Sequence, residues 1–371
     1  MHYPSLISKI LLSFADNFAD HHHDLSALLL TPQKHLWLGS DEASTIERLS
    51  FIDKQHFGEH KQYRVAEFFD LPAPEEEEID IEGLAYSDYY LWLIGSHSYK
   101  RKKPKPDKSD VKNIKRLTKV KTEANRYIIG RIPLVNGELI GECPHPAKPN
   151  EYLSARKLQI TTKGNLLMEA LANDSHLGFF VKAEIPGKDN GFDIEGIEIC
   201  QNRIFLGLRG PVLRGWAIIL EIQLQESNSP GLLDLKYLEI SGEKYKKHFI
   251  YLNGLGIRDL CWDNQDLLIL AGPTMDLDGP ITVYRLQGGV NSDENVLNYP
   301  QPVLEIPYGK GNDRAEGITL FEEITGVKSL LVVHDSPAEN RLQGKASLIA
   351  DVLQLNSEQR AASSEQLAIN S

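Results

Sequence analysis

The sequence has little cysteine, and the residues it has lack the spacing of a metal site or of a disulfide framework. Cys143, Cys200 and Cys261 are scattered through 371 residues. An odd, dispersed set of this kind indicates free thiols in a reducing compartment. Long apolar runs are also missing, which excludes a membrane-spanning helix of about 20 residues. We therefore expect a cytoplasmic protein that makes no contact with a membrane.

Targeting and catalytic motifs are missing as well. The apolar stretch 7–14 is interrupted by Ser8, Lys9 and Ser13 and has no basic region before it, unlike a secretory signal. The chain has no G-x-S-x-G, P-loop, H-E-x-x-H or dinucleotide-binding motif, so motifs leave open whether it is an enzyme. Its net charge of -12 makes nucleic acid an unfavourable partner.

What the sequence does contain is a fivefold repeat. Each copy begins with a short strand-like run, passes a tight turn, and continues into a second apolar run that ends in small or polar residues. One or two further strand-like runs follow each copy. Units of four strands with turns between them are typical of a β-propeller, which is an all-β fold. The copies span residues 24–41, 80–97, 193–209, 256–273 and 314–335.

The two ends of the chain predict how the ring closes. Residues 346–355 supply a third strand to the last copy, and the polar residues 356–371 after them are predicted to be disordered. The N-terminal run 7–14 supplies the missing fourth strand of that copy, which hides two sheet edges. We therefore predict a single propeller domain over residues 1–355, and we expect it to be a monomer.

The number of blades depends on the wide interval between the second and third copies. This interval has room for a sixth blade, but residues 100–122 are highly charged, and residues 165–172 have the apolar spacing of a short helix. We therefore favour five blades over six, with a basic insertion at 100–122 and a helical insertion at 150–176. Strands are also predicted at 179–185 and 236–240.

Alignment of the first strands places charged residues in columns. Because positions two apart face the same side of a strand, we expect two stacked, partly acidic rings in the channel. The second strand of each copy runs back to the same mouth of the channel, where the connections are long, as is usual at binding sites. The third position holds Ser26, Glu82, Glu195, Arg258 and Glu316; the first position holds Asp24, Asp80, Asp193, Gly256 and Arg314; the second strands end at Asp41, His97, Arg209, Pro273 and Asp335.

Carboxylates crowded into a channel need protons, a cation or arginines beside them. One interpretation is a network of ion pairs with Arg258, Arg314 and Arg209 that holds the blades in register. Another is a divalent cation, calcium or magnesium, because both prefer oxygen ligands. The ligands of such a cation would be Glu82, Glu195, Glu316, Asp80 and Asp193.

The insertion is the one strongly basic part of the chain. Residues 100–121 contain eleven Lys or Arg and two Asp, a local charge of +9 in a chain of net charge -12. Such a run is either a solvated surface segment or an arm that attracts an anionic ligand, such as a phosphate ester or, less favoured, nucleic acid, to the mouth. Arg209 and Arg214 would add guanidinium groups, which suit carboxylate or phosphate.

Four runs in the sequence resemble a bacterial family called domain of unknown function 3616, over residues 24 to 355. They are Ile185-Pro-Gly-Lys with Gly191-Phe-Asp-Ile-Glu-Gly, Gly207-Leu-Arg-Gly-Pro, Gly256-Ile-Arg-Asp-Leu and Ala315-Glu-Gly. The family implies no activity that can be transferred. The Asp-x-Glu-Gly strand is more distantly similar to esterase-like phytase propellers, which implies a phosphoester hydrolase. The fourth copy departs from that pattern, because Arg258-Asp259 replaces Glu-Gly.

Two functions follow from these observations. The first is a propeller that binds a small anionic ligand or a protein partner at the channel mouth. The second is a metal-assisted hydrolase of an anionic ester, with the cation held by the acidic rings and His97 as acid and base. In either case the groups that would hold the ligand are Arg209, Arg214, Arg258, Lys100, Arg101 and Asp335.

Overall fold

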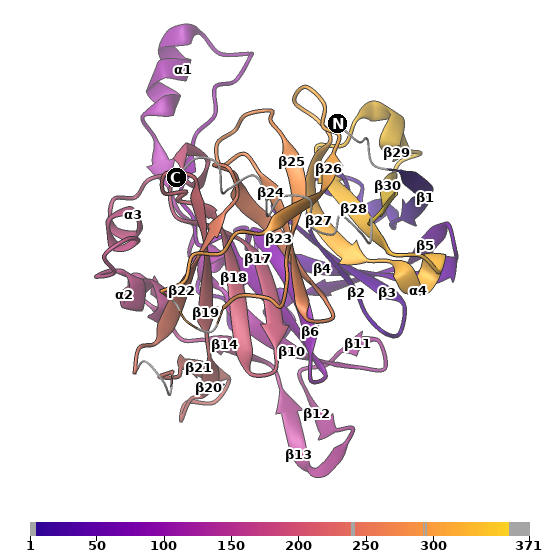
Figure 1. Ribbon diagram of the computed structural model, residues 1–371, viewed down its shortest axis with the longest axis horizontal. Helices are drawn as coiled ribbons and strands as arrows, with labels where there is room; N and C mark the ends of the chain where they lie inside the picture. The colour runs from indigo at the N-terminus through magenta and orange to yellow at the C-terminus, as the bar shows by residue number, and fades with distance from the viewer. Residues whose placement is uncertain (1–4, 239–241, 292, 294, 356–371) are drawn as a thin grey trace, which may run out of the picture.

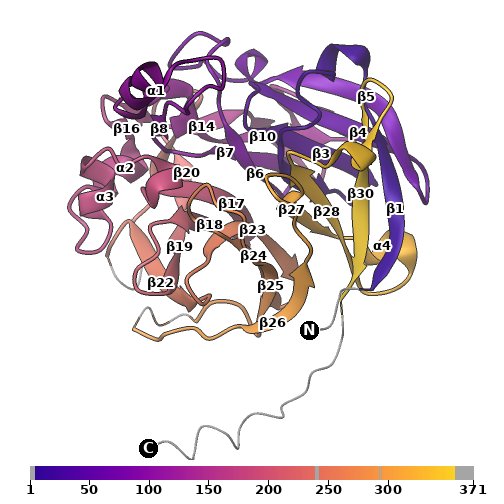
Figure 2. The same ribbon diagram turned by 90° about the horizontal axis from the view of Figure 1, so that it is seen from above.

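The computed structural model describes residues 5–238, 242–291, 293 and 295–355 and is a β-propeller (Figures 1 and 2). Four-stranded antiparallel units stand around a central axis, and the first strands β2, β6, β17, β23 and β27 contact one another in a ring. We keep five blades as the interpretation of this pairing. The predicted all-β propeller is confirmed, whereas the predicted tail 356–371 lies outside the described residues.

In the first four blades the strands follow one another in chain order, from the inner strand beside the channel to the outer strand. In the last blade the outer strand comes from the N-terminus of the chain. Blade 1 has β2 (Leu25–Leu30), β3 (His35–Ser40), β4 (Thr45–Asp53) and β5 (His56–Arg64). Blade 2 has β6 (Ile81–Ser87), β7 (Tyr90–Gly95), β10 (Ile129–Val135) and β14 (Arg156–Leu158). Blade 3 has β17 (Asp193–Cys200), β18 (Arg203–Gly210), β19 (Trp216–Ile222) and β22 (Tyr245–Tyr251). Blade 4 has β23 (Gly256–Asp263), β24 (Asp266–Gly272), β25 (Ile281–Leu286) and β26 (Gln301–Ile306).

Blade 5 closes the ring as the sequence predicts. It has β27 (Arg314–Leu320), β28 (Ser329–Asp335), β30 (Ser347–Gln354) and, from the other end of the chain, β1 (Leu6–Ser13). Strand β1 pairs antiparallel with β30 and, through a short parallel contact, with β5 of blade 1. The N-terminal strand therefore covers the outer edges of both terminal blades, which would otherwise be open for pairing.

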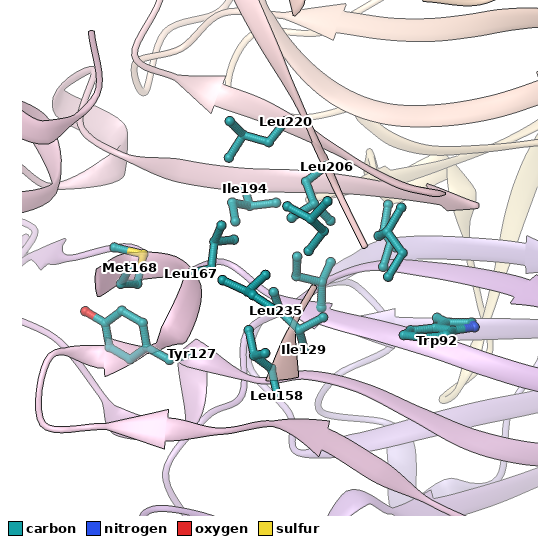
Figure 3. Packing of buried hydrophobic residues seen from close by; sticks show 14 of the residues in the cluster. Trp92, Tyr127, Ile129, Leu158, Leu167, Met168, Ile194, Leu206, Leu220 and Leu235 are labelled. Atoms are coloured by element: carbon teal, nitrogen blue, oxygen red, sulfur yellow. The ribbon is translucent and has the colours of Figure 1, made fainter. Parts of the chain in front are cut away.

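The cores lie between neighbouring blades, and the apolar second strands serve two of them at once. Along β24, Leu267, Ile269 and Ala271 pack toward blade 3, whereas Leu268 and Leu270 pack toward blade 5. This follows from the alternation of side chains along a strand, and it explains why these strands are apolar throughout. Figure 3 shows the core between blades 2 and 3, where Ile129 and Leu158 of blade 2 meet Ile194, Leu206 and Leu220 of blade 3.

Insertions enlarge blades 2 and 3. The basic insertion forms β8 (Lys100–Arg101), α1 (Asp110–Leu117) and β9 (Val120–Lys121). The predicted helical insertion contains α2 (Leu166–Leu171), but strands β13 (Lys148–Ser154), β14, β15 (Ile160–Thr161) and β16 (Gly164–Asn165) occupy the same range. Other short elements are β11 (Glu138–Leu139), β12 (Glu142–His145), β20 (Leu224–Glu226), β21 (Leu232–Leu235), β29 (Leu342–Gln343), α3 (Gly178–Lys182), α4 (Glu322–Thr325), η1 (Asp16–Phe18), η2 (Val65–Glu67), η3 (Ala124–Tyr127), η4 (Gly187–Asp189) and η5 (Glu339–Arg341).

Two of the predicted strands are wrong. Residues 179–182 belong to helix α3 and residues 183–185 to no strand. Residues 236–238 are not in a strand either, while 239–240 lie outside the described residues. The fourth strand of blade 3 is β22 instead. Among the helices of the described residues, none is long and apolar enough to cross a bilayer.

Candidate functional site

The inner hairpin of each blade carries a β-bulge at the same place. The register between inner and second strands skips one residue, as between Ile81 and Gly83 or between Ala315 and Gly317. A bulged residue has no partner across the ladder, and bulges commonly re-aim a side chain beside a binding site. The skipped residues are Ser26, Glu82, Glu195, Arg258 and Glu316, the third-position column of the sequence repeat, and all five are buried.

Three of these bulged residues form one ion-paired network across blades 3, 4 and 5. Arg258 Nη1 lies 3.2 Å from Glu195 Oε2 and also binds Glu316. Arg209 Nη1 binds the other oxygen of Glu195 at 2.5 Å. Two further donors go to backbone carbonyls, from Arg209 Nε to Thr274 and from Arg258 Nη2 to Pro273, whereas Arg258 Nε is buried without a hydrogen-bond partner among the described residues. These two guanidinium groups are therefore already occupied within the protein.

Glu82 has no such partner. Its side chain is 8% exposed, and among the described residues no hydrogen bond or ion pair reaches it. Burial raises its pKa well above the ordinary value, and the carboxylates of Asp80, Glu195, Glu316 and Asp41 raise it further. Those neighbours come from blades 1, 2, 3 and 5, so Glu82 lies among carboxyl groups from four of the five blades.

Two more carboxyl groups at the mouth each have an oxygen atom without a hydrogen-bond partner among the described residues. Oδ1 of Asp193 and Oδ1 of Asp41 are buried without a hydrogen-bond partner in the described part of the chain. Burial, then Glu195, raises the pKa of Asp193 to about 8, and burial with Asp80 raises that of Asp41 well above its usual range. Burial also raises the pKa of Glu316 to about 7, although Arg258 opposes the shift. The channel thus holds more carboxyl groups than its arginines neutralise.

A second network ties down the predicted metal ligand Asp80. Arg126, just before β10, is fully buried and binds Asp80. The same Nη1 donates to the hydroxyl groups of Ser96 and Ser98, each at 3.0 Å. Sequence reasoning missed Arg126, because it lies in η3, between the basic insertion and β10, and belongs to no column of the repeat.

The mouth also holds Lys188, from the turn η4 between blades 2 and 3. Its pKa is raised because Glu316, Asp41 and Asp335 outweigh burial and Arg209. No carboxylate of the described residues lies within 4.0 Å of its ammonium group. The only sequence signal for Lys188 was its place in one of the runs that resemble the family.

The structure does not bring His97 to the channel. Its ring is completely buried, Nδ1 lies 2.6 Å from the carbonyl oxygen of Gly95, and Nε2 lies 2.8 Å from Asn165 Nδ2. Asn165 also accepts bonds from Leu167 N and Met168 N and so begins helix α2. Burial lowers the pKa of His97 to about 4. His97 therefore anchors the helical insertion and is not available as acid or base at the mouth.

The other predicted ligand-binding residues are dispersed around the rim. Lys100 binds Glu78 and lies 3.7 Å from Glu123, and Arg101 Nε binds Asp189 at 2.7 Å. Arg214 is exposed. Asp335 accepts a bond from Ser336, and Arg314 pairs with Asp276 at 2.9 Å. Lys103 lies 3.9 Å from the same Asp276, so the basic insertion does stand beside the mouth.

The predicted divalent cation finds no ligand set in this geometry. No three His, Cys, Asp or Glu side chains of the described residues converge as a metal site would require. Glu195, Glu316 and Asp80 point their oxygens at arginines. The metal-assisted hydrolase thus remains a prediction that this arrangement does not support.

Antiparallel blades around a channel lined by bulged, charged inner strands define this protein as a β-propeller with a polar channel. The chain belongs to the family described as protein of unknown function (DUF3616), whose profile matches residues 24–351. This confirms the resemblance seen in the sequence. No curated protein matches the chain.

Solved structures of similar shape include several enzymes. Virginiamycin B lyase from Staphylococcus aureus is 11% identical, with 94% of this chain and 99% of that chain covered and a TM-score of 0.38. The PQQ-bound aldose sugar dehydrogenase from Streptomyces coelicolor is 11% identical, with the same coverage and a TM-score of 0.36. Similarity at this level carries no functional argument, and the assignment of the fold rests on the strand pairing above.

Proposed function

We propose that the protein binds a small ligand at the channel mouth and that the part of the ligand held there is cationic, an ammonium or guanidinium group. The observation that carries this proposal is Glu82, a bulged and buried carboxyl group with no partner among the described residues, which lies among carboxyl groups from four blades. A buried polar group without a hydrogen bond is costly, so a ligand that supplies donors and positive charge is favoured.

The charge balance of the channel supports a cation over the anion predicted from the sequence. Arg209 and Arg258 already pair their charges with Glu195 and Glu316 and donate to backbone carbonyls, and the one donor of Arg258 without a partner, Nε, is buried. Asp41, whose charge acts on Glu82, and Asp193, which is close to Glu195, each have instead an acceptor oxygen without a partner among the described residues. Lys188 faces the same group of acids and shows how a positive charge is attracted there.

Calorimetric titration with matched small probes tests this proposal. We expect butylammonium and methylguanidinium to bind, and butyrate, inorganic phosphate and glucose not to bind. Glu82→Gln keeps the shape of the side chain and removes the negative charge that a bound cation would stabilise on it, and we expect it to weaken cation binding about tenfold or more. Glu76→Gln, at an exposed position, is the matched control and should bind as wild type does.

Binding of phosphate or butyrate but not of the cations would overturn the proposal in favour of an anion site. An equal loss of cation affinity in the Glu82 and Glu76 variants would show that Glu82 does not contact the ligand. If no probe binds at any concentration reached, water fills the channel and the carboxyl groups are structural.

Affinity for the cation should rise with pH. The pKa values of Glu316, about 7, and Asp193, about 8, lie above their ordinary values, so both groups still carry protons at about pH 6 and lose them as the pH rises. Butylammonium keeps its charge throughout this range. We therefore expect its dissociation constant to fall between about pH 6 and about pH 8.5, as titrations at several pH values would show. A constant or rising dissociation constant would contradict this assignment of the site.

A further inference from the structure

The tip of the basic insertion, residues 102–119, stands clear of the propeller body (Figure 1). Its two-stranded stem, β8 and β9, pairs Lys100 with Lys121 and Arg101 with Val120. The ion pairs from Arg101 to Asp189 and from Lys103 to Asp276 fasten the stem beside the channel mouth. The tip is therefore held in one place on the mouth side of the molecule.

The tip carries a dense positive charge that the protein itself does not neutralise. Arg116 donates its Nε to the carbonyl oxygen of Lys103, and Lys103 has its contact with Asp276. Within the part of the chain that the structure describes, no carboxylate lies within 4.0 Å of the other ammonium groups of the tip. Those groups belong to Lys102, Lys105, Lys108, Lys112, Lys115 and Lys119.

Helix α1 also exposes an aliphatic face. Val111 is 78% exposed, Ile114 65% and Leu117 43%, and no residue of α1 is buried. Their spacing of three places these side chains on one side of the helix, which Asp110 shares, with Lys115 at its edge and Lys112 and Arg116 on the opposite side. An ordered helix whose aliphatic side packs on nothing in its own chain is a candidate docking surface.

We propose that this tip docks the protein on an anionic phospholipid surface, with the channel mouth turned toward that surface. Basic side chains around a few aliphatic ones match anionic headgroups above acyl chains. A nucleic-acid backbone would leave the aliphatic face unused, and the tip has no aromatic side chain to stack on bases. A protein partner would need a concave acidic socket to receive a projecting tip.

The acidic body of the propeller does not prevent this contact. Residues 100–121 contribute +9, so the rest of the chain carries a charge of about -21, which an anionic surface would repel. An eight-residue helix is about 12 Å long, which exceeds the Debye length of about 8 Å at physiological salt. The tip can therefore contact the headgroups while the charge of the body is largely screened. This revises the expectation that the protein makes no membrane contact.

Vesicle sedimentation of the full chain tests the proposal. We expect the protein to sediment with phosphatidylcholine vesicles that contain about 30% phosphatidylserine at about 0.1 M salt, and to be released at about 0.5 M salt. Pure phosphatidylcholine vesicles should not retain it. The triple variant Lys112→Glu, Lys115→Glu, Lys119→Glu should lose binding about tenfold or more, and Val111→Ser with Ile114→Ser about threefold or more.

The chain offers a control with the same change in net charge. Lys54, Lys163 and Lys345 are exposed and lie outside the insertion, so Lys54→Glu, Lys163→Glu, Lys345→Glu should sediment nearly as wild type does. Because α1 buries nothing, the tip variants should unfold at the wild-type temperature. The proposal is overturned if the control variant loses binding equally, or if the protein binds heparin or duplex DNA but not the vesicles. Failure of cation binding in the channel would leave this result untouched.

Discussion

Arg126→Met is expected to lower the free energy of unfolding by about 3–5 kcal/mol, as when one partner of a buried ion pair is removed. Arg126 is 1% exposed and binds Asp80, Ser96 and Ser98 at the end of the second strand of blade 2. Methionine has a similar length but leaves the Asp80 carboxylate buried without its cation. Urea unfolding of the variant and of the wild type at neutral pH measures the difference.

The control is an arginine in an exposed pair. Arg64 contacts Glu67 and Glu75 at the surface, so Arg64→Met should change stability by less than about 1 kcal/mol. In the double variant Arg126→Met with Asp80→Asn, part of the lost stability should return, because the unpaired charge is gone. Equal losses in the Arg126 and Arg64 variants would show that the buried network contributes little.

Arg258→Met is expected to cost a comparable amount, about 3–5 kcal/mol at about pH 8, and clearly less at about pH 5. Arg258 joins Glu195 of blade 3 to Glu316 of blade 5, so its loss leaves Glu316 buried without its arginine, while Glu195 keeps Arg209. The pKa of Glu316 is already raised to about 7. The stability that this group contributes is present below its unfolded pKa and is lost as pH rises through the folded one. Without Arg258 the folded pKa rises further, so the loss extends to higher pH.

To complete this test, the free energy of unfolding of Arg258→Met and of the double variant Arg258→Met with Glu316→Gln is measured at both pH values. The double variant Arg258→Met with Glu316→Gln should recover stability at about pH 8. At about pH 5 it should differ little from Arg258→Met, because Glu316 of the single variant is then protonated and as uncharged as the glutamine. A cost that is the same at both pH values would mean that Arg258 stabilises the blades through packing, and that the charges of the network are incidental.

Much of the fold could be predicted because the repeat consists of local patterns, namely the alternation of strands and the turns between them. Apolar second strands such as residues 266–272 alternate between two cores, and this requires only the twofold period of a strand. The N-terminal strand β1 was expected from the missing strand of the last copy. Alignment of the five copies showed the third-position column, but it did not predict that each of these residues forms a β-bulge. The column consists of Ser26, Glu82, Glu195, Arg258 and Glu316.

The insertions were the hardest part to predict. Hairpin β20–β21 lies in the chain between two strands of blade 3, yet β21 pairs in parallel with β14 of blade 2. Residues 178–182 are helical although their apolar side chains suggested a strand. Segments outside a repeat are placed by the surfaces they meet, and short apolar runs do not distinguish helix from strand.

The sequence by itself determined that this chain forms a closed propeller and which five side chains share the third position of the inner strands, because strand period, turns and repeat are properties of neighbouring residues. Only the tertiary structure decided which charges meet. Arg258 forms ion pairs with both Glu195 and Glu316, and Arg126 forms one with Asp80. The ring of His97 contacts Asn165, and Glu82 has no partner among the described residues. Ion pairing depends on distances of a few ångströms between residues far apart in the chain, and no local pattern encodes those distances.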